Sequence, residues 1–497
     1  MYDLLVIGGG INGTGIARDA AGRGLNVLLC EKDDLAQHTS SASTKLIHGG
    51  LRYLEHYDFS LVRKALKERE VLWAMAPHII WPVRFALPHN KDMRPAWIVR
   101  LGLFLYDHIG GRKRLPSTTP LKRGRDKVFD PLKAEFKKGF EYSDCWVDDS
   151  RLVVLNAVDA ARRGAKIMTH ACCTALTNNG DHWTADIQIQ DASPVQVQAK
   201  VVVNASGPWV DDIVDLAGTR AEAARVRLVK GSHIITAPLF EGETSYFFQG
   251  ADGRIIFAIP YLAGQFTLIG TTDVPFGDNP DEIIASADEI QYLCDCANEY
   301  FQRQISPTDV LSTYSGVRPL YDDRNDNASE VTRDYVLTVD AEDDRAPLVS
   351  VFGGKITTYR KLAEDVLDLV KKETGFQGEK WTAKSHLPGG DYTISNIPHI
   401  RQDLHAKYAW FDSFTLDRMI RAYGKRTAVL LGSAQCKEDL GLHYGAGLYE
   451  AEVAYLIEHE FVHSTEDIIW RRSKLGLVMT EAEIQTLNAR MINRQSA

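Results

Sequence analysis

Residues 3–31 read DLLVIGGGINGTGIARDAAGRGLNVLLCE, an apolar strand, a glycine-rich turn, an amphipathic helix and a second strand that ends at Glu31. Gly8 allows the tight turn, Gly10 lets the backbone approach a pyrophosphate, and Gly13 lets the helix pack close to the strand. The pyrophosphate is expected at the helix N-terminus, where free N–H groups and the dipole favour negative charge. Glu31 follows at the distance where a carboxylate binds the adenosine ribose hydroxyls. The stretch therefore predicts a dinucleotide-binding fold.

Composition places the chain among soluble globular proteins. Its 497 residues are enough for two or three domains, and 44% are hydrophobic and 25% charged. A net charge of −9 argues against a nucleic-acid binder. The seven cysteines are odd in number and fit no zinc spacing, so we expect reduced cytosolic thiols and no metal site. We expect no signal peptide before the strand at residue 3, and no apolar run approaches the roughly 20 residues that cross a bilayer.

The hydrophobic period changes along the chain and predicts three kinds of region. Residues 165–204 contain alternating strands that end in an apolar run. Short β runs over residues 226–273, with an Asp-Gly turn at 252–253, predict an antiparallel sheet separate from the nucleotide fold. Strand signals vanish after residue 390, and residues 414–430 and 447–495 have helical patterns. We therefore expect a helical C-terminal domain.

Two further segments suit a flavin-containing dinucleotide. Residues 202–209 form a strand that enters a small-residue turn, which fits passage beside a cofactor or an ordinary Gly-Pro turn. In residues 349–364 a strand meets Gly353-Gly354 and a helix begins near Thr357. Because a reduced flavin carries negative charge at its N1/O2 edge, a helix N-terminus directed there would stabilise it, and Lys355 could do the same.

A third segment, residues 39–53, is rich in hydroxyl side chains and ends in His48, Arg52 and Tyr53. Its hydroxyls and N–H groups could bind the pyrophosphate and the polar edge of the ring, although a solvated Ser/Thr loop has the same composition. The residues expected to bind the cofactor are Gly8, Gly10, Asn12, Gly13, Glu31, Ser40, Ser41, Thr44, Lys45, Ser206, Gly207, Gly354, Lys355, Ile356 and Thr357.

Five motifs make the chain recognisable. They are IGGGINGTGIARDAAGRG at 7–24, HGGLRYL at 48–54, SGVRPL at 315–320, TRDY at 332–335 and GGKITTYRKLA at 353–363. With these motifs the chain resembles, over nearly its whole length, the FAD-dependent glycerol-3-phosphate dehydrogenases, the membrane-associated, quinone-linked aerobic enzymes. The resemblance implies oxidation of sn-glycerol 3-phosphate to dihydroxyacetone phosphate, non-covalent FAD and a homodimer.

The resemblance also implies the fold, which is of the α/β class. We expect a Rossmann-like FAD-binding domain of the glutathione-reductase and D-amino-acid-oxidase type, an antiparallel β substrate domain and an all-α C-terminal domain. The expected boundaries are residues 1–75, 140–222 and 320–385 for the FAD-binding domain, 76–139 and 223–319 for the substrate domain, and 390–497 for the C-terminal domain.

A phosphate monoester carries nearly two negative charges, so its site needs fixed cations. Arg52, Arg318 and Arg333 are the candidates, since each lies in a turn-flanked motif of the family. Arginine suits phosphate because its fork donates two parallel hydrogen bonds, although any one arginine could equally form a surface ion pair. Tyr53 and Thr271 are expected to orient the substrate hydroxyls.

Removal of a hydride from C2 of the substrate to the flavin requires a base for the hydroxyl proton. His48 is the first candidate because a neutral imidazole titrates in the useful pKa range, and His233 is the second. Either histidine could instead be an ordinary polar or core residue. Lys355 and Arg318 are expected to stabilise the developing alkoxide and carbonyl oxygen.

Residues 94–114 suggest a membrane contact. One helical face carries Trp97, Ile98, Leu101, Leu105 and Ile109, and the basic run Arg112, Lys113 and Arg114 follows it. An apolar face with basic flanks suits a helix in the interface of an anionic leaflet, although a buried core helix before a solvated basic loop has the same pattern. Contact with a membrane fits electron delivery to ubiquinone or menaquinone. We expect a peripheral protein on the cytoplasmic face of the inner membrane, or a cytoplasmic one.

Three other functions compete with this interpretation. A glycerol-3-phosphate oxidase would reduce oxygen to hydrogen peroxide, but that group often carries an insertion that is not evident here. A flavin amine oxidase of the glycine or sarcosine type takes a carboxylate substrate, and the arginine set and the GGKITTYR motif at 353–360 argue against it. A non-catalytic FAD-binding scaffold would not be bleached by any polyol phosphate. The electron acceptor, the base and the oligomeric state stay open from the sequence.

Overall fold

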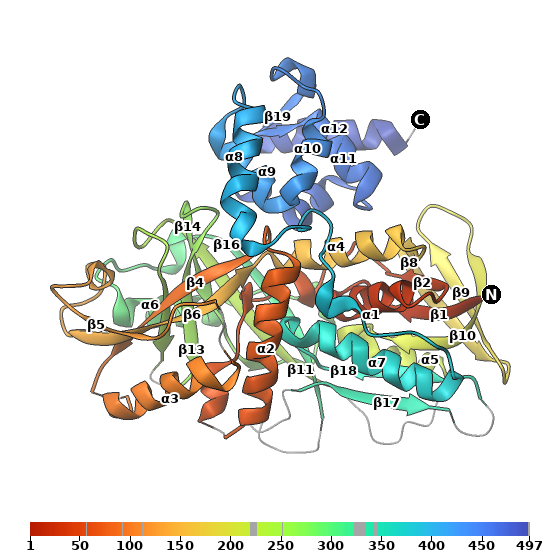
Figure 1. Cartoon of the computed structure of the whole chain (residues 1–497), viewed down its shortest axis with the longest axis horizontal. Coiled ribbons are helices and arrows are strands. Elements are labelled where there is room, and N and C mark those ends of the chain that lie inside the picture. Colours follow the sequence, from red (N-terminus) through yellow and green to blue (C-terminus); the bar gives the residue numbers. More distant parts are fainter. Residues whose placement is uncertain are drawn as a thin grey trace.

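The computed structural model describes residues 1–55, 57–91, 93–111, 114–218, 226–250, 252–322, 334–341 and 345–495. Two sheets lie side by side in the lower part of Figure 1, and the helical C-terminal region, drawn in blue, lies above them. Within the part of the chain that is described, no helix combines the length and the apolar character needed to cross a membrane.

The first sheet contains the predicted strand, turn, helix and strand. Its parallel strands follow the order β18-β10-β1-β2-β7, β17 is antiparallel to β18, and β8 and β9 continue from β10 as an antiparallel meander. The bounds are β1 Tyr2–Ile7, β2 Val27–Cys30, β7 Lys166–Met168, β8 Ala171–Asn178, β9 Trp183–Ile189, β10 Val195–Asn204, β17 Val336–Asp340 and β18 Leu348–Phe352.

Both faces of this sheet are covered, because successive side chains of its buried strands pack into clusters on opposite sides. Leu4 and Val6 of β1 face a cluster with the helices α1 (Ile11–Gly22) and α7 (Tyr359–Thr374), and α4 (Asp149–Arg162) packs beside α1. Leu5 and Ile7 face the β8–β9 meander and α5 (Val210–Leu216). Since successive side chains in a strand point to opposite faces, a continuous apolar run such as β1 is buried on both sides. The predicted Rossmann-like fold is confirmed.

The second sheet has the order β15-β11-β14-β13-β12-β4-β6-β3, with β16 beside β11 and β5 beside β6. Every pair is antiparallel except β12 with β4, which is parallel. The bounds are β3 Leu46–Ile47, β4 Ile80–His89, β5 Thr119–Lys122, β6 Lys138–Val147, β11 Val226–Thr236, β12 Ser245–Gln249, β13 Ile255–Tyr261, β14 Phe266–Gly270, β15 Val274–Pro275 and β16 Val310–Tyr321. The helix α6 (Ala287–Tyr300) packs against it.

The predicted antiparallel region over residues 226–273 is therefore present, with one parallel pair added where β4 joins it. The strands β3 and β6 also belong to this sheet, although the sequence placed residues 1–75 and 140–222 with the nucleotide fold. The physical reason is that the chain crosses between the sheets at these strands, so a division by sequence segment cuts through them. The residue numbers at which the FAD-binding and substrate domains were predicted to meet stay a prediction.

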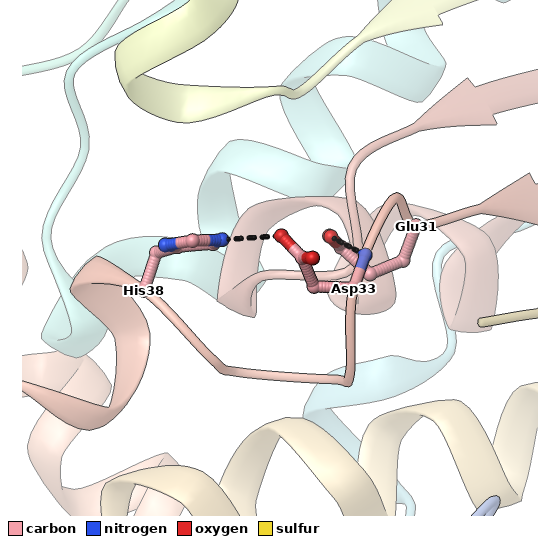
Figure 2. A group of neighbouring side chains, drawn as sticks. All are labelled: Glu31, Asp33 and His38. Carbon is pink, nitrogen blue, oxygen red and sulfur yellow. Dashed lines mark hydrogen bonds and ion pairs between the residues drawn. The ribbon is translucent and has the colours of Figure 1, made fainter. Parts of the chain in front are cut away.

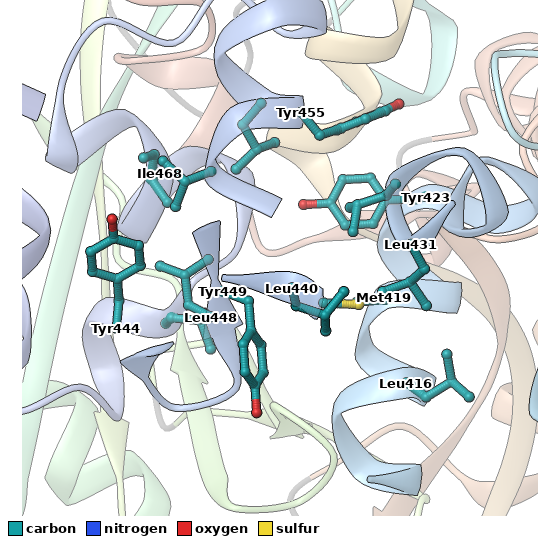
Figure 3. Packing of buried hydrophobic residues seen from close by; sticks show 14 of the residues in the cluster. Leu416, Met419, Tyr423, Leu431, Leu440, Tyr444, Leu448, Tyr449, Tyr455 and Ile468 are labelled. Atoms are coloured by element: carbon teal, nitrogen blue, oxygen red, sulfur yellow. The ribbon is translucent and has the colours of Figure 1, made fainter. Parts of the chain in front are cut away.

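The C-terminal region is helical, as expected, around a core of its own (Figure 3). Its helices are α8 Ile397–Lys407, α9 Ser413–Tyr423, α10 Thr427–Leu431, α11 Glu450–His459 and α12 Glu481–Gln495. The stretch 447–495 is not one helix, because a π-helical turn over Asp467–Arg472 and irregular backbone separate α11 from α12. A short hairpin of β19 (His443–Gly445) and β20 (Leu448–Tyr449) is the only strand pair there among the described residues.

The helix α3 (Ala96–Ile109) has an apolar side in solvent. Trp97 is 69% exposed and Leu101 is 51% exposed, whereas Leu103 and Tyr106 on the other side are buried against the second sheet and α2 (Phe59–Met75). The alternative of a wholly buried core helix is thus wrong, because the helix is apolar on two sides and only one of them meets the core. Arg112 and Lys113 lie outside the described residues.

Candidate active site

A cavity of about 370 Å³ lies where β1 ends and α1 begins. Since the carboxyl ends of parallel strands are where nucleotide sites form in such sheets, this is the expected place for a dinucleotide. The predicted cofactor residues that line it are Gly8, Gly10, Asn12, Glu31, Ser40, Ser206, Gly207 and Gly354. Those outside its lining are Gly13, Ser41, Thr44, Lys45, Lys355, Ile356 and Thr357.

The three glycines of the turn serve two different purposes. A Cβ on Gly13 would lie 1.9 Å from the Gly8 carbonyl oxygen, and one on Gly8 would lie 2.5 Å from the Ala205 carbonyl oxygen. Both clashes are with backbone, so these glycines are needed by the protein itself. A Cβ on Gly10 would meet only the Ser40 Oγ, at 3.0 Å. Gly10 is therefore open toward the cavity, which fits close approach of a ligand.

Glu31 lies at the end of β2, beside the turn (Figure 2). Its carboxylate accepts hydrogen bonds from the backbone N–H of Gly9 at 2.6 Å and of Asp33 at 2.9 Å, and Asp33 pairs with His38 at 2.7 Å. Burial raises the pKa of Glu31. The three side chains are close enough together to hold a cation. The carboxylates of Glu31 and Asp33, however, already interact with the Gly9 and Asp33 N–H groups and with His38. Glu31 and His38 also line the cavity.

Asn12 marks the far end of the cavity, at the Gly353-Gly354 turn. Its Nδ2 donates to the Gly353 carbonyl oxygen at 3.1 Å, whereas its buried Oδ1 has no hydrogen-bond partner among the described residues. A Cβ on Gly354 would lie 3.0 Å from the Asn12 amide. Because a buried acceptor without a donor is costly, this oxygen fits a bound group that offers an N–H or O–H.

Three predicted site residues, His48, Arg52 and Tyr53, lie between β3 and the end of the short helix 51–54, and the predicted catalytic Lys355 contacts Tyr53. The backbone N–H of His48 donates to Thr357 Oγ1 at 3.3 Å, which ties this loop to the start of α7. The Lys355 ammonium lies 3.8 Å from the centre of the Tyr53 ring. Within the described residues, neither Lys355 nor Arg52 has a carboxylate partner. Both cations are half-buried, and the Lys355 charge is close enough to His48 to affect the pKa of its imidazole.

The surroundings of His48 favour its neutral form. Its side chain is half-buried and its ring lies edge-on to Phe257, with 6.2 Å between ring centres. Burial, the Lys355 charge and the Arg69 charge together lower the pKa of His48 to about 4. The imidazole is therefore neutral at pH 7, and its pKa lies below the range for which the sequence favoured it as a base.

Of the other predicted substrate residues, His233 lies on β11, Arg318 lies on β16 and Thr271 directly follows β14. Arg318 pairs with Asp273 at 2.6 Å and donates to Thr271 Oγ1 at 3.1 Å, so its charge is largely compensated. His233 shares a hydrogen bond of 2.9 Å with Thr44 Oγ1, and burial lowers the pKa of His233 well below its usual value. Arg333 lies outside the described residues.

The strand register connects the two groups. Gly270 is paired with His233 on one side and with Phe257 on the other, and Phe257 is the residue that His48 contacts. A Cβ on Gly270 would lie 2.1 Å from the His233 ring, so the imidazole occupies the space that a side chain would take. Because directly opposed residues share a face, His233 and Phe257 lie on the same face of the second sheet, and His48 lies between Phe257 and Thr357.

Lys45, which the sequence predicted to bind the cofactor, forms an ion pair with Asp149. Its buried ammonium is 2.9 Å from the Asp149 carboxylate and 3.0 Å from the Ser41 carbonyl oxygen. Its charge is used to hold the loop onto α4. A role for Lys45 in cofactor binding stays a prediction. Asp149 already neutralises its positive charge.

The sequence did not predict an ion pair between the C-terminal region and the loop that follows Glu31. Asp34, three residues beyond Glu31, is fully buried and accepts two hydrogen bonds of 2.7 Å from Arg472, and Arg471 also pairs with it. The π-helical turn over Asp467–Arg472 thus holds the loop that borders the cavity beside Glu31. No local signal in the sequence joins residues this far apart.

Known proteins resemble the chain over both its parts. A family model described as "FAD dependent oxidoreductase" matches residues 3–360, and one described as "C-terminal domain of alpha-glycerophosphate oxidase" matches residues 380–491. The glycerol-3-phosphate dehydrogenase of Pseudomonas aeruginosa is 50% identical over 483 residues, which are 97% of this chain and 93% of that protein. The D-erythritol 1-phosphate dehydrogenase of Brucella abortus is 49% identical over 482 residues, 97% of this chain and 96% of that protein.

A solved structure agrees with these matches. The glycerol-3-phosphate dehydrogenase from Bacillus halodurans, complexed with FAD, superposes with a TM-score of 0.78 at 27% identity. The superposition covers 100% of this chain and 90% of that one.

Proposed function

Because the chain belongs to the FAD-dependent glycerol-3-phosphate dehydrogenase family, we propose that it oxidises sn-glycerol 3-phosphate to dihydroxyacetone phosphate. FAD is the cofactor of the family, and the open approach at Gly10 and the unpartnered Asn12 Oδ1 fit it. Bound FAD supplies the acceptor for the substrate's hydride.

One observation supports a phosphate ester as the class of substrate. Arg52 and Lys355 are cations without counter-ions in the described part of the chain, and they flank the loop that bears His48. A phosphate ester satisfies both, because guanidinium and ammonium groups donate charge-assisted hydrogen bonds to its oxygens. The neutral His48 accepts the hydroxyl proton, and the Lys355 charge stabilises the negative charge that develops on that oxygen.

We expect Arg52→Ala to lower kcat/KM for sn-glycerol 3-phosphate by about 10- to 150-fold while FAD stays bound. The reason is the loss of charged hydrogen bonds to phosphate worth roughly 1.5–3 kcal/mol. Steady-state kinetics with a dye acceptor measures the loss. Arg94→Ala is the control, since Arg94 is exposed and paired with Glu55 at 3.4 Å, and it should change kcat/KM less than about twofold. An unchanged kcat/KM in Arg52→Ala removes this residue from the site.

The identity of the polyol needs its own measurement. The relatives from P. aeruginosa and B. abortus are named for different polyol phosphates at 50% and 49% identity. Both substrates carry a secondary alcohol beside a phosphorylated carbon, so the same cations and base serve either. Anaerobic mixing of the purified yellow protein with each phosphate, and with glycerol, while following flavin absorbance gives the ratio of kcat/KM. A higher value for D-erythritol 1-phosphate overturns the substrate proposed here.

We also propose that the electrons pass to a membrane quinone and that α3 lies in the surface of an anionic leaflet. The support is the exposed apolar side of α3, where Trp97, Leu101, Phe104 and Leu105 are 38–69% exposed. Such a face suits an interfacial helix. Hydrogen peroxide release in place of quinone reduction, at comparable turnover, favours the oxidase instead.

The double variant Trp97→Asp, Leu101→Asp is expected to lose at least about tenfold of its binding to anionic vesicles. Each substitution removes apolar burial of roughly 1.5 kcal/mol or more and adds a repelled charge. Co-sedimentation with phosphatidylglycerol vesicles measures binding. Phe414→Asp is the matched control, since Phe414 is 56% exposed on α9 in the C-terminal region. Equal binding of all three proteins, or none by the unmodified protein, contradicts the membrane proposal.

A further inference from the structure

The loop that carries His48 is held from below by a buried tyrosine. The hydroxyl of Tyr106, on the inner side of α3, accepts a hydrogen bond of 2.7 Å from the backbone N–H of Gly49. The same hydroxyl donates to the Asp144 carboxylate of β6 at 2.9 Å. Tyr106 and Asp144 are each only 2% exposed. The hydroxyl's single proton is thus committed to Asp144, which leaves its oxygen to accept from Gly49.

A buried cation completes this chain of contacts. Arg69 of α2 donates to the Asp144 carboxylate at 2.6 Å and to the Ser143 carbonyl oxygen at 3.0 Å, and is 3% exposed. Burial raises the pKa of Asp144 to about 6, against the opposing effects of Arg69, of Tyr106 and of the Gly49 N–H, which also approaches this carboxylate. Three elements, α2, β6 and α3, therefore converge on one peptide N–H.

The peptide next to His48 is held by a hydrogen bond on each side. On one side the His48 N–H donates to Thr357 Oγ1, and on the other the Gly49 N–H donates to Tyr106. A Cβ on Gly49 would lie 2.6 Å from Leu66 Cδ2 and 2.8 Å from the Tyr106 ring. The backbone therefore lies directly on the aromatic ring, and the hydroxyl determines the tilt of the peptide that follows the imidazole.

Stability alone is a poor reason for this arrangement. A buried ion pair costs desolvation that its attraction often fails to recover, and an apolar core would hold α3 as well. An ionised acceptor does, however, polarise the Tyr106 hydroxyl and strengthen its acceptance from Gly49.

We propose that Tyr106 is a positioning residue, oriented by Asp144, that holds the backbone of Gly49 so that the His48 imidazole meets the substrate hydroxyl. The inference rests on the proposed function, in which His48 is the base. It adds a residue that does not touch substrate and comes from the helix whose other side is exposed.

The first test compares Tyr106→Phe with Tyr246→Phe. Tyr246 is also 2% exposed and donates to the Val128 carbonyl oxygen at 2.8 Å in the same sheet, away from the loop. Both variants lose one buried hydroxyl, so both should keep their FAD and show similar falls in Tm. Anaerobic stopped-flow at saturating sn-glycerol 3-phosphate should show flavin reduction slowed about tenfold in Tyr106→Phe alone, as for one lost hydrogen bond. Equal rates in the two variants overturn the inference.

The second test asks whether Tyr106 acts through His48. In a His48→Asn background, Tyr106→Phe should slow flavin bleaching by less than about twofold, since coupled residues are not additive. A full tenfold loss in that background overturns the inference and leaves the role of His48 intact. A normal rate in His48→Asn itself overturns both proposals.

A variant at Asp144 gives a second test for the case in which Tyr106→Phe does not hold FAD. Asp144→Asn keeps an oxygen that accepts from the Tyr106 hydroxyl but removes the charge that polarises it. The rate of flavin reduction should then fall between those of the unmodified protein and His48→Asn, with the half-saturating substrate concentration unchanged. A rate equal to that of the unmodified protein contradicts the positioning role.

Discussion

Replacing Gly13 with alanine is expected to yield a protein that is purified with little or no flavin. The new Cβ would lie 1.9 Å from the Gly8 carbonyl oxygen, and backbone on both sides of the contact must move. Such overpacking costs about 3 kcal/mol or more, which lowers FAD affinity at least about 100-fold when the displaced turn is the binding site. The ratio of flavin absorbance to protein absorbance, together with Tm, measures the effect.

Two matched variants separate the causes. Gly102→Ala should keep full flavin and normal Tm, because a Cβ there meets nothing within 4 Å in an ordinary helix. Gly10→Val should lose flavin but keep the Tm of the cofactor-free protein, since only Ser40 Oγ is near a Cβ at that position. Full yellow colour in Gly13→Ala or Gly10→Val contradicts the role given to the turn.

His48→Asn is expected to slow flavin reduction by about 100- to 10,000-fold while FAD remains bound. This range is what a positioned general base contributes. Asparagine keeps a polar side chain of similar size but cannot take up the proton. Anaerobic stopped-flow with saturating sn-glycerol 3-phosphate gives the rate. A loss of less than about tenfold transfers the role of base to another group, and His233→Asn is the next variant to measure.

The pH profile supplies an independent check on His48. Its pKa is lowered to about 4, mainly by burial and then by Lys355 and Arg69. A base works in its neutral form, so the rate of flavin reduction at saturating substrate should stay level from pH 7 to about 5 and fall as the pH drops through about 4. Saturating substrate is used because the substrate phosphate itself titrates at about pH 6 and would bend kcat/KM there. Lys355→Met removes one of the two charges that lower this pKa, so the acidic limb should move to higher pH. A limb that starts near pH 6.5 in the unmodified protein contradicts the environment described here.

Local patterns predicted the local structure. The strand, turn and helix from β1 to α1 and the Gly353-Gly354 turn before α7 were expected from contiguous residues and are present. The period-two runs of residues 226–273 likewise became strands of the second sheet. These features depend on backbone conformation and on which face of one element is apolar, and both can be read from a short window.

Partners across the fold could not be predicted in this way. The sequence made Arg318 a candidate phosphate ligand with a surface ion pair as the alternative, and the fold places Asp273 beside it, whereas Arg52 and Lys355 have no carboxylate partner among the described residues. It marked Lys45 as a cofactor ligand, but the buried Asp149 neutralises it. Whether a charge is available depends on the nearest counter-ion in space, and that depends on how the elements pack.

By itself, the sequence determined the glycine turn, the alternation of strands and helices, and the identity of the side chains available for chemistry. Only the tertiary structure decided that Tyr106 lies beneath Gly49 and that Arg472 reaches Asp34. The physical reason is range. Glycine conformation and hydrophobic period act over a few residues, whereas a buried hydrogen bond between distant segments exists only after both have been desolvated in one packed core.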